Sequence, residues 1–116
     1  MLKILLVEDD KTIVANLTEY LNGAGYIVRS VSGQAAAMAA LAEEKADLVL
    51  ANIVADVIIP LAPVVPRLLK EDGVFLCSGI IDTRGDEVAA ALEAAGLHVI
   101  RRREKTGWIA LEAKQK

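Results

Sequence analysis

The sequence contains little cysteine, histidine or aromatic residue. Its 116 residues include one Cys, one His, one Trp, one Phe and two Tyr, and aromatic residues make up 3% of the chain. One cysteine, Cys77, cannot form an internal disulfide, and one histidine, His98, has no Cys or second His near it to share a metal. These absences favour a reduced, cytoplasmic protein over a disulfide-stabilised secreted scaffold.

The chain also lacks an uninterrupted apolar run and an excess of positive charge. Its most apolar stretch, residues 53–69, is interrupted by an acid, three prolines and an arginine, and is shorter than the roughly 20 residues of a membrane-spanning helix. The formal net charge of -3 disfavours a nucleic-acid backbone or an anionic membrane as the main partner, because both require positive surface. We expect a monomer with neither kind of partner.

Aliphatic residues dominate what is present. The hydrophobic fraction is 54% and charged residues make up 25%, a mixture that suits strands buried under Ala-rich helices. Strand and helix patterns alternate, as they do in a parallel sheet. Strands are predicted over 3–7, 26–31, 47–52, 74–78, 97–102 and 108–113, with helices over about 10–23, 33–44 and 86–95. The sequence therefore predicts one α/β domain over residues 1–116, with a three-layer, doubly wound, mostly parallel sheet.

Local signals refine this pattern at several points. Asp9 or Asp10 can cap the first helix, and three prolines predict a kinked helix or two short ones after residue 53. Residues 71–73, Glu-Asp-Gly, predict a turn before the fourth strand. The last two strands are joined by so few residues that they must run antiparallel.

The first half of the chain resembles the CheY-like receiver domains of two-component response regulators. The residues that carry this resemblance are ILLVEDD at 4–10, Gly25-Tyr26 and ADLVL at 46–50. In that family the acid pair after the first strand, here Glu8 and Asp9, holds Mg²⁺ beside a phosphoaccepting aspartate at the end of the third strand. Asn52 stands at that aspartate's position, and an amide lacks the anionic oxygen needed to attack phosphorus.

The second half, from about residue 47, resembles the methyltransferase domain of the enzymes that methylate lysines of a large-subunit ribosomal protein. The shared segments are DLVLANIVAD at 47–56, PLAP at 60–63, SGI at 78–80 and Gly107-Trp108. This resemblance implies a Rossmann-like fold with strand order 2-1-3-4-6-5 and an antiparallel sixth strand. It also implies that Asn52 lies beside the methyl donor and the substrate amine. The glycine-rich turn with which such enzymes bind S-adenosylmethionine is replaced by Glu8-Asp9-Asp10-Lys11.

Together these resemblances predict a chimera, engineered or recombined, with a receiver-like half at 1–50 and a methyltransferase-like half at 51–116. We expect it to retain no activity, to be no enzyme and to need no cofactor beyond weakly bound Mg²⁺ at Glu8 and Asp9. One alternative is a degenerate receiver that binds proteins independently of phosphorylation. Another is a residual fragment that binds S-adenosylmethionine or a substrate.

The remaining polar and aromatic residues are given structural roles. Clustered acids at a helix N-terminus serve as a cap and complement the helix dipole. Asn52 is expected to hydrogen-bond nearby backbone or Ser78, and His98 to lie on the outer face of an end strand. The run of arginines at 101–103 indicates a protected sheet edge. Trp108 and Cys77 are expected in or near the core.

Overall fold

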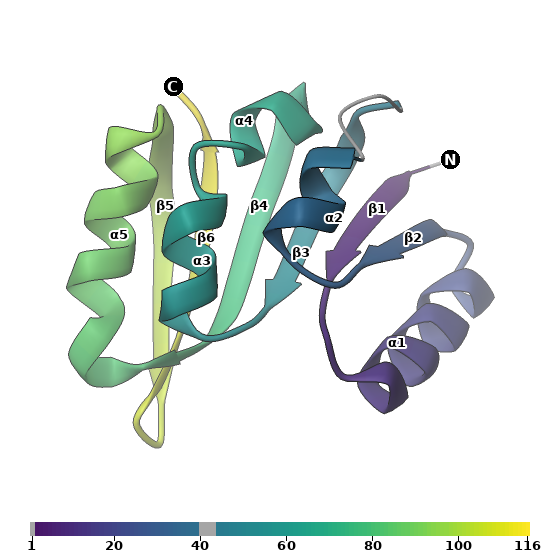
Figure 1. Ribbon diagram of the computed structural model, residues 1–116, viewed down its shortest axis with the longest axis horizontal. Coiled ribbons are helices and arrows are strands. Elements are labelled where there is room, and N and C mark those ends of the chain that lie inside the picture. Colours follow the sequence, from purple (N-terminus) through teal and green to yellow (C-terminus); the bar gives the residue numbers. More distant parts are fainter. Residues whose placement is uncertain (1, 40–43) are drawn as a thin grey trace.

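The computed structural model describes residues 2–39 and 44–116, and they form one mixed sheet of six strands in the order β2-β1-β3-β4-β6-β5 (Figure 1). The strands β1 to β4 pair in parallel, whereas β6 is antiparallel to both β4 and β5. The predicted α/β class, strand order and antiparallel last strand are confirmed. The strands are β1 (Lys3–Val7), β2 (Ile27–Val31), β3 (Ala46–Asn52), β4 (Leu69–Ile81), β5 (Leu97–Lys105) and β6 (Trp108–Gln115).

Five α-helices and a 3₁₀ turn connect the described strands. The helices are α1 (Lys11–Gly23), α2 (Gln34–Ala39), α3 (Ala55–Leu61), α4 (Val65–Leu68) and α5 (Gly85–Ala94), and the turn is η2 (Asp82–Arg84). The helix predicted over 33–44 includes residues 40–43, which lie outside the described part of the chain. The proline-rich segment forms two short helices, as one of the two alternatives predicted. Among the described residues, no helix combines the length and apolarity needed to cross a lipid bilayer.

One face of the sheet carries the hydrophobic core. In Figure 1, α2, α3 and α5 lie in a row over the near face of the sheet. Side chains that alternate along the strands pack against these helices, as the period of two in a strand requires. The buried cluster includes Leu5, Val7, Val49, Phe75, Cys77, Ile109 and Leu111 from the strands and Ile58, Leu61, Val88 and Leu92 from the helices. We call this the covered face.

Among the described helices, only α1 lies on the opposite face, at one end of the sheet, and we call this the open face. Leu48 of β3 and Val74 and Leu76 of β4 belong to the alternate set that points away from the core, and each is only half-buried. A groove between this face and Leu21 places α1 on the same side as these residues. None of the residues of α1, all of which are described, is fully buried. The two faces of this sheet are therefore packed very unequally.

The turn predicted at residues 71–73 lies inside β4. Pairing with β3 shifts register here, because Ala46 pairs with Leu69 and Leu48 pairs with Val74. Five residues of β4 thus span two of β3, so the Glu-Asp-Gly segment bulges without ending the strand. A Cβ added at Gly73 would lie 3.1 Å from the carbonyl oxygen of Ala46, so this close approach requires glycine. The turn signal was local, and strand pairing overrides it.

The prediction that Trp108 packs in or near the core is wrong. Trp108 is 54% exposed, whereas the next residue, Ile109, is 1% exposed. Alternation along β6 turns Ile109, Leu111 and Ala113 toward the covered face, and Trp108 therefore points toward the open face. Cys77, by contrast, is buried as predicted, and burial raises the pKa of its thiol to about 12.

Candidate functional site

The carboxyl ends of β1, β3 and β4 bring three polar side chains together. Val7 pairs with Ala51, and Asn52 pairs with Ser78, so Glu8 follows β1 directly beside the end of β3. Asn52 Nδ2 donates to Glu8 Oε1 at 2.8 Å, and Ser78 Oγ donates to Asn52 Oδ1 at 3.2 Å. The predicted bond between Asn52 and Ser78 is confirmed.

Glu8 is buried at this edge, although it was predicted to belong to a helix cap or a weak metal site. Glu8 is 4% exposed. Among the residues that the structure describes, it is the one buried residue with a charged or polar side chain. Its Oε2 accepts the backbone N–H groups of Asp9 at 3.0 Å and Asp10 at 3.3 Å, while Oε1 faces the amide of Asn52. Both oxygens accept N–H groups, so Glu8 is used as a hydrogen-bond acceptor. The adjacency of parallel strand ends is the sequence signal that could have linked Glu8 to Asn52.

This arrangement fixes which way the amide of Asn52 points. A carboxylate can only accept hydrogen bonds, so the NH₂ group must face Glu8 and the amide oxygen must face Ser78. Gly79 follows Ser78 with a φ of +84°, and a Cβ there would lie 3.2 Å from Asn52 Oδ1. The backbone beside the amide oxygen is thus kept free of a side chain.

A shallow pocket of about 250 Å³ lies next to this amide. Asp9, Asn52 and Gly79 line its polar side, and Val54 and Trp108 contribute exposed apolar surface. A carboxylate, an amide oxygen and an indole ring all attract a cation or an N–H donor. The pocket therefore has the chemistry to hold an amine.

A second hollow, of about 540 Å³, adjoins the first at the ends of β1 and β2. Its polar lining comes from Glu8, Asp9, Lys11, Arg29, Ser30 and Ser32. Open α/β sheets bind their ligands in crevices outside the carboxyl ends of the strands. These two hollows share Asp9 and together form the candidate site.

The acids of this site have separate roles. Asp10 Oδ1 accepts the backbone N–H groups of Thr12 at 2.9 Å and Ile13 at 3.2 Å, so Asp10 is the residue that caps α1. Glu8 is buried in its hydrogen-bond network, and Asp9 is exposed at the pocket. In the described part of the chain, no group of three or more His, Cys, Asp or Glu side chains is arranged to hold a metal. Weak Mg²⁺ binding at Glu8 and Asp9 stays a prediction.

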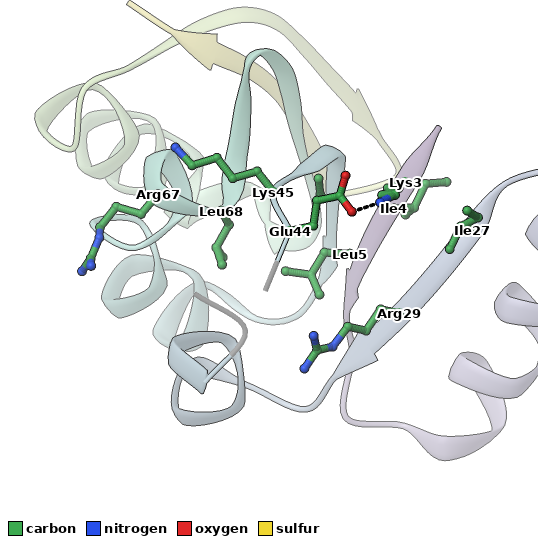
Figure 2. Close-up of a pocket in the computed structure, with 10 residues that line it drawn as sticks. Lys3, Ile4, Leu5, Ile27, Arg29, Glu44, Lys45, Arg67 and Leu68 are labelled. Atoms are coloured by element: carbon green, nitrogen blue, oxygen red, sulfur yellow. Dashed lines mark hydrogen bonds and ion pairs between the residues drawn. The ribbon is translucent and has the colours of Figure 1, made fainter. Parts of the chain in front are cut away.

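A third cavity, of about 200 Å³, lies at the opposite, amino end of the strands (Figure 2). Lys3, Arg29, Lys45 and Arg67 line it, but Figure 2 shows their charged groups spread well apart. Lys3 is already paired with Glu44. Because these positive groups do not point toward one common position, the cavity is not arranged to bind an anion.

His98 lies at the sheet edge formed by β5, as predicted. Its Nδ1 is 3.3 Å from Glu93 Oε2, and its side chain is 64% exposed. The three arginines that follow it are exposed on the same edge strand. Arg102 pairs with Asp86 of α5 at 2.6 Å. Neither His98 nor these arginines lines the candidate site.

Several solved structures that share this fold are named as methyltransferases or RNA-processing proteins. A ribosomal protein L11 methylase from Lactobacillus delbrueckii subsp. bulgaricus superposes with a TM-score of 0.79 at 23% identity, covering 99% of this chain and 70% of that chain. A fibrillarin pre-rRNA processing protein from Methanococcus jannaschii superposes with a TM-score of 0.68 at 13% identity, covering 98% and 66%. At these identities the likeness establishes a methyltransferase-type fold.

The chain belongs to the ribosomal protein L11 methyltransferase (PrmA) family, whose model matches residues 13–116. The L11 methyltransferase of Agathobacter rectalis is 54% identical over 72 residues, covering 62% of this chain and 22% of the relative. That of Desulfitobacterium hafniense is 51% identical over 70 residues, covering 60% and 22%. The chain thus spans about a fifth of the length of these curated relatives.

This membership corrects the interpretation of the chain as a chimera. The family model continues through the segment assigned to a receiver and begins within α1, so the receiver resemblance and the degenerate-receiver alternative are wrong. A strand followed by a helix occurs in both families. Short motifs in such a unit therefore resembled a receiver domain although the chain is not one. Asn52 is therefore not a replacement for a phosphoaccepting aspartate, because it lies within the part of the chain that matches the methyltransferase family.

The expectations about activity and cofactor are corrected by the same finding. The expectation that the chain is unrelated to any working enzyme is wrong, because the family to which it belongs is one of methyltransferases. A methyltransferase family implies S-adenosylmethionine as cosubstrate, in place of the expected absence of a cofactor beyond weak Mg²⁺.

Proposed function

We propose that the chain forms the acceptor side of an S-adenosylmethionine-dependent methyltransferase, with the pocket at Asn52 receiving an amine of a ribosomal protein. The observation that carries this proposal is the amide of Asn52, fixed between Glu8 and Ser78 at the carboxyl edge of the sheet. The names of the L11 methyltransferase relatives support the class of acceptor. A cytoplasmic location, where ribosomal proteins are assembled, belongs to the same proposal.

Asn52 is suited to orient the amine. Methyl transfer requires the nitrogen lone pair to point at the methyl group, so the N–H groups of the amine must be held elsewhere. The oxygen of Asn52 can accept one N–H while it keeps its bond from Ser78, since a carbonyl oxygen has two lone pairs. Glu8 prevents the amide from turning its NH₂ group toward the amine.

Asp9 and Trp108 are suited to attract the substrate before the reaction. A lysine amine is positively charged at neutral pH, and both a carboxylate and an indole face attract a cation. Asp9 lines both hollows, so its charge acts at the point where they meet. These residues would bind and orient the amine. The bound ammonium must first give up one proton to water at the open pocket. Its lone pair then attacks the methyl group as the bond from that methyl group to sulfur breaks, so no nucleophile from this chain is needed.

The residues after β1 and β2 have charges that suit S-adenosylmethionine. They would bind it through side chains, whereas a glycine-rich turn binds it through backbone N–H groups. When bound, the cosubstrate supplies a methyl group on a positively charged sulfonium, which suits the neighbourhood of Asp9. The backbone N–H groups of Asp9 and Asp10 already donate to Glu8 and do not offer themselves to an anion. Lys11, Ser30 and Ser32 of the larger hollow would instead bind the carboxylate of the methionine part of the cosubstrate.

The test is methyl transfer from tritiated S-adenosylmethionine to purified ribosomal protein L11. We expect labelled L11 with the natural sequence and at least a tenfold loss with Asn52→Ala, because the amide supplies a hydrogen bond made to the reacting amine. Asn16→Ala, which removes an exposed amide from α1, is the matched control and should keep the activity. An NMR titration with S-adenosylmethionine gives a second readout at Glu8, Asp9 and Asn52. Absence of both label and shifts would contradict the proposal.

A further inference from the structure

The hairpin of β5 and β6 carries cations on the open face of the sheet. Residues that stand opposite each other in an antiparallel pair project from the same face. Lys105 stands opposite Trp108, and Arg103 stands opposite Ala110, so both cations share the face of Trp108. Arg102 projects from the covered face, where it is paired with an acid of α5. The cations at 103 and 105 therefore have no part in holding the hairpin against α5.

Arg103 and Lys105 are both exposed. Neither takes part in an ion pair found within residues 2–39 and 44–116. Arginine and lysine side chains are stable in water, so this surface, unlike an apolar one, needs no segment to cover it. The two cations are thus available to a charged ligand.

The acids nearest to these cations in the strand pairing do not cancel their charge. Glu112 stands opposite Arg101, a further cation of the same face. Glu104 stands opposite Ile109, which is 1% exposed, and it therefore projects toward the covered face. Asp82 lies beside the hairpin turn, and its carboxylate forms no ion pair in the part of the chain that the structure describes. The open face of the hairpin therefore carries net positive charge.

The same surface leads to the pocket at Asn52. Asn52 pairs with Ser78 of β4, the next position across β6 is Ala110, and Ala110 stands opposite Arg103. Three inter-strand spacings thus separate Asn52 from Arg103, which is about 14 Å. The side chains between them are small, and Trp108 borders this path where it lines the pocket. A polypeptide bound at the pocket can therefore cross the sheet toward the cations.

We propose that Arg103 and Lys105 bind acidic residues of the acceptor polypeptide, three or four positions from the lysine whose amine enters the pocket at Asn52. An extended chain advances about 3.4 Å per residue, so four residues span the path of about 14 Å. The guanidinium group of Arg103 offers paired N–H donors that match a carboxylate. This inference rests on the proposed function, because that proposal supplies the acceptor polypeptide.

A nucleic-acid backbone fits this surface less well than an acidic polypeptide does. Proteins bind single-stranded RNA along a continuous track of cations, because every nucleotide carries a charge. Beside the pocket the hairpin offers only Arg103 and Lys105, in a chain with a formal net charge of -3. Two cations are enough for one or two carboxylates.

Two synthetic peptides with one central lysine provide the test. One has glutamate three and four positions to either side of that lysine, and the other has glutamine at the same positions. Each is titrated into the isotope-labelled chain and followed by amide NMR. We expect the glutamate peptide to bind at least tenfold more tightly and to shift the amides of Arg103, Lys105 and Trp108. High salt should reduce this difference, because it screens exposed charges.

Paired variants locate the binding. Arg103→Gln with Lys105→Gln should weaken binding of the glutamate peptide at least tenfold. Arg101→Gln with Lys114→Gln removes two exposed cations from the same face, farther from Trp108 along the hairpin, and should change the affinity less than twofold. Equal affinity for the two peptides, no binding of either, or equal losses in the two double variants would overturn the proposal. Tighter binding of a single-stranded uridine oligonucleotide, lost in the first double variant, would identify RNA as the occupant and would also overturn it.

A third peptide separates this inference from the methyl-transfer proposal. It keeps the glutamates and has norleucine, which lacks an amine, in place of the lysine. We expect it to retain the shifts at Arg103 and Lys105 and to lose those at Asn52. If it shifted Asn52 as the lysine peptide does, the pocket would not recognise the amine, and the proposed function would be contradicted while the acid-binding role of the two cations stood.

Discussion

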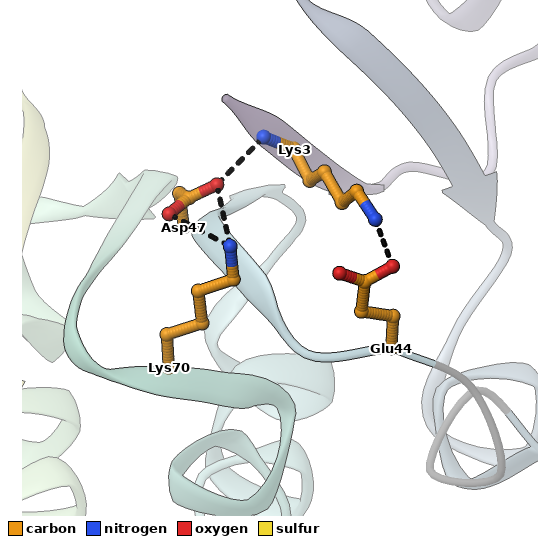
Figure 3. Close-up of polar contacts among 4 residues, drawn as sticks. All are labelled: Lys3, Glu44, Asp47 and Lys70. Carbon is orange, nitrogen blue, oxygen red and sulfur yellow. Dashed lines mark hydrogen bonds and ion pairs between the residues drawn. The ribbon is translucent and has the colours of Figure 1, made fainter. Parts of the chain in front are cut away.

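At the scale of single residues, Asp47 connects the amino ends of three strands (Figure 3). Its Oδ2 accepts the backbone N–H of Lys3 in β1 at 2.8 Å. Lys70 Nζ of β4 lies 3.3 Å from the same carboxylate, and Asp47 itself belongs to β3. The Lys3 hydrogen bond and, after it, the Lys70 ammonium lower the pKa of the Asp47 carboxyl, despite an opposing effect of burial. Lys3 Nζ is paired separately with Glu44.

The lowered pKa of Asp47 predicts a stability that depends on pH. A carboxyl whose pKa is lower in the folded state than in the unfolded chain stabilises the fold above the unfolded pKa, which is about 3.9 for Asp. This contribution is lost as the pH falls below that value and through the folded pKa. Asp47→Asn should therefore lower the free energy of unfolding at pH 7, and the difference from the natural protein should shrink toward pH 3.

Urea unfolding at pH 7, 5 and 3 measures this dependence. Asp72→Asn is the matched control, because Asp72 is an exposed acid of β4 with no ion pair among the described residues. We expect the control to follow the natural protein at all three pH values. A difference between the natural protein and Asp47→Asn that stayed constant with pH would refute the role given to the charge.

At the scale of elements, α1 depends on its cap more than the other helices do. Asp10 accepts two backbone N–H groups at its first turn, while no residue of this fully described helix is itself fully buried. The stripe of Ile13, Leu17 and Leu21 is only half-covered. Local interactions therefore provide a larger share of the stability of α1 than of α5, in which Val88 and Leu92 are 0% exposed.

Removal of the cap should destabilise the protein measurably. Asp10→Ala is expected to cost about 1 kcal/mol of unfolding free energy, the usual value for an N-cap aspartate. Asp9→Ala removes the neighbouring acid, whose side chain does not cap the helix, and should cost much less. Urea denaturation of both variants at pH 7 makes the comparison. Equal losses would mean that negative charge near the helix end, and not the cap geometry, stabilises α1.

Elements with strong local signals were predictable from the sequence, and those set by pairing were not. The Asp10 cap, the end of α1 at Gly23 and the break of the proline-rich segment into α3 and α4 all follow from local chemistry. The length of β4 does not. Residues 71–73 have the composition of a turn, but pairing with β3 keeps them in the strand as a bulge.

In the candidate site, too, some features could be predicted from the sequence and others depend on which strands are neighbours. Asn52 was predicted to bond nearby backbone or Ser78, and the second alternative is the one that the structure shows. Glu8 was predicted to be part of a helix cap or a weak metal ligand, since an acid after a strand gives no sign of burial. Its burial depends on β1 and β3 being adjacent, which places the Asn52 amide against it. The assignment to a receiver failed for a related reason, because short motifs in βα units fit more than one family.

At the scale of the whole molecule, the unequal faces of the sheet divide it into a rigid and a weaker part. The covered face holds the central strands β3, β4 and β6 against α3 and α5, with side chains such as Phe75, Leu92 and Leu111 at 0% exposure. The edge formed by β2 and α1 has few such contacts. Cooperative units with few buried apolar contacts open at lower free energy than the core.

Native-state hydrogen exchange should reveal this division. We expect the amides of β3, β4 and β6 to exchange only through global unfolding, and those of α1 and β2 to exchange through an opening of lower free energy. Leu92→Ala should lower the protection of every element, because emptying a fully buried leucine site costs about 2–5 kcal/mol. Leu17→Ala, in the half-buried stripe of α1, should lower only the protection of α1 and β2. If instead α1 exchanged as slowly as β4, the division into a rigid and a weaker part would be wrong.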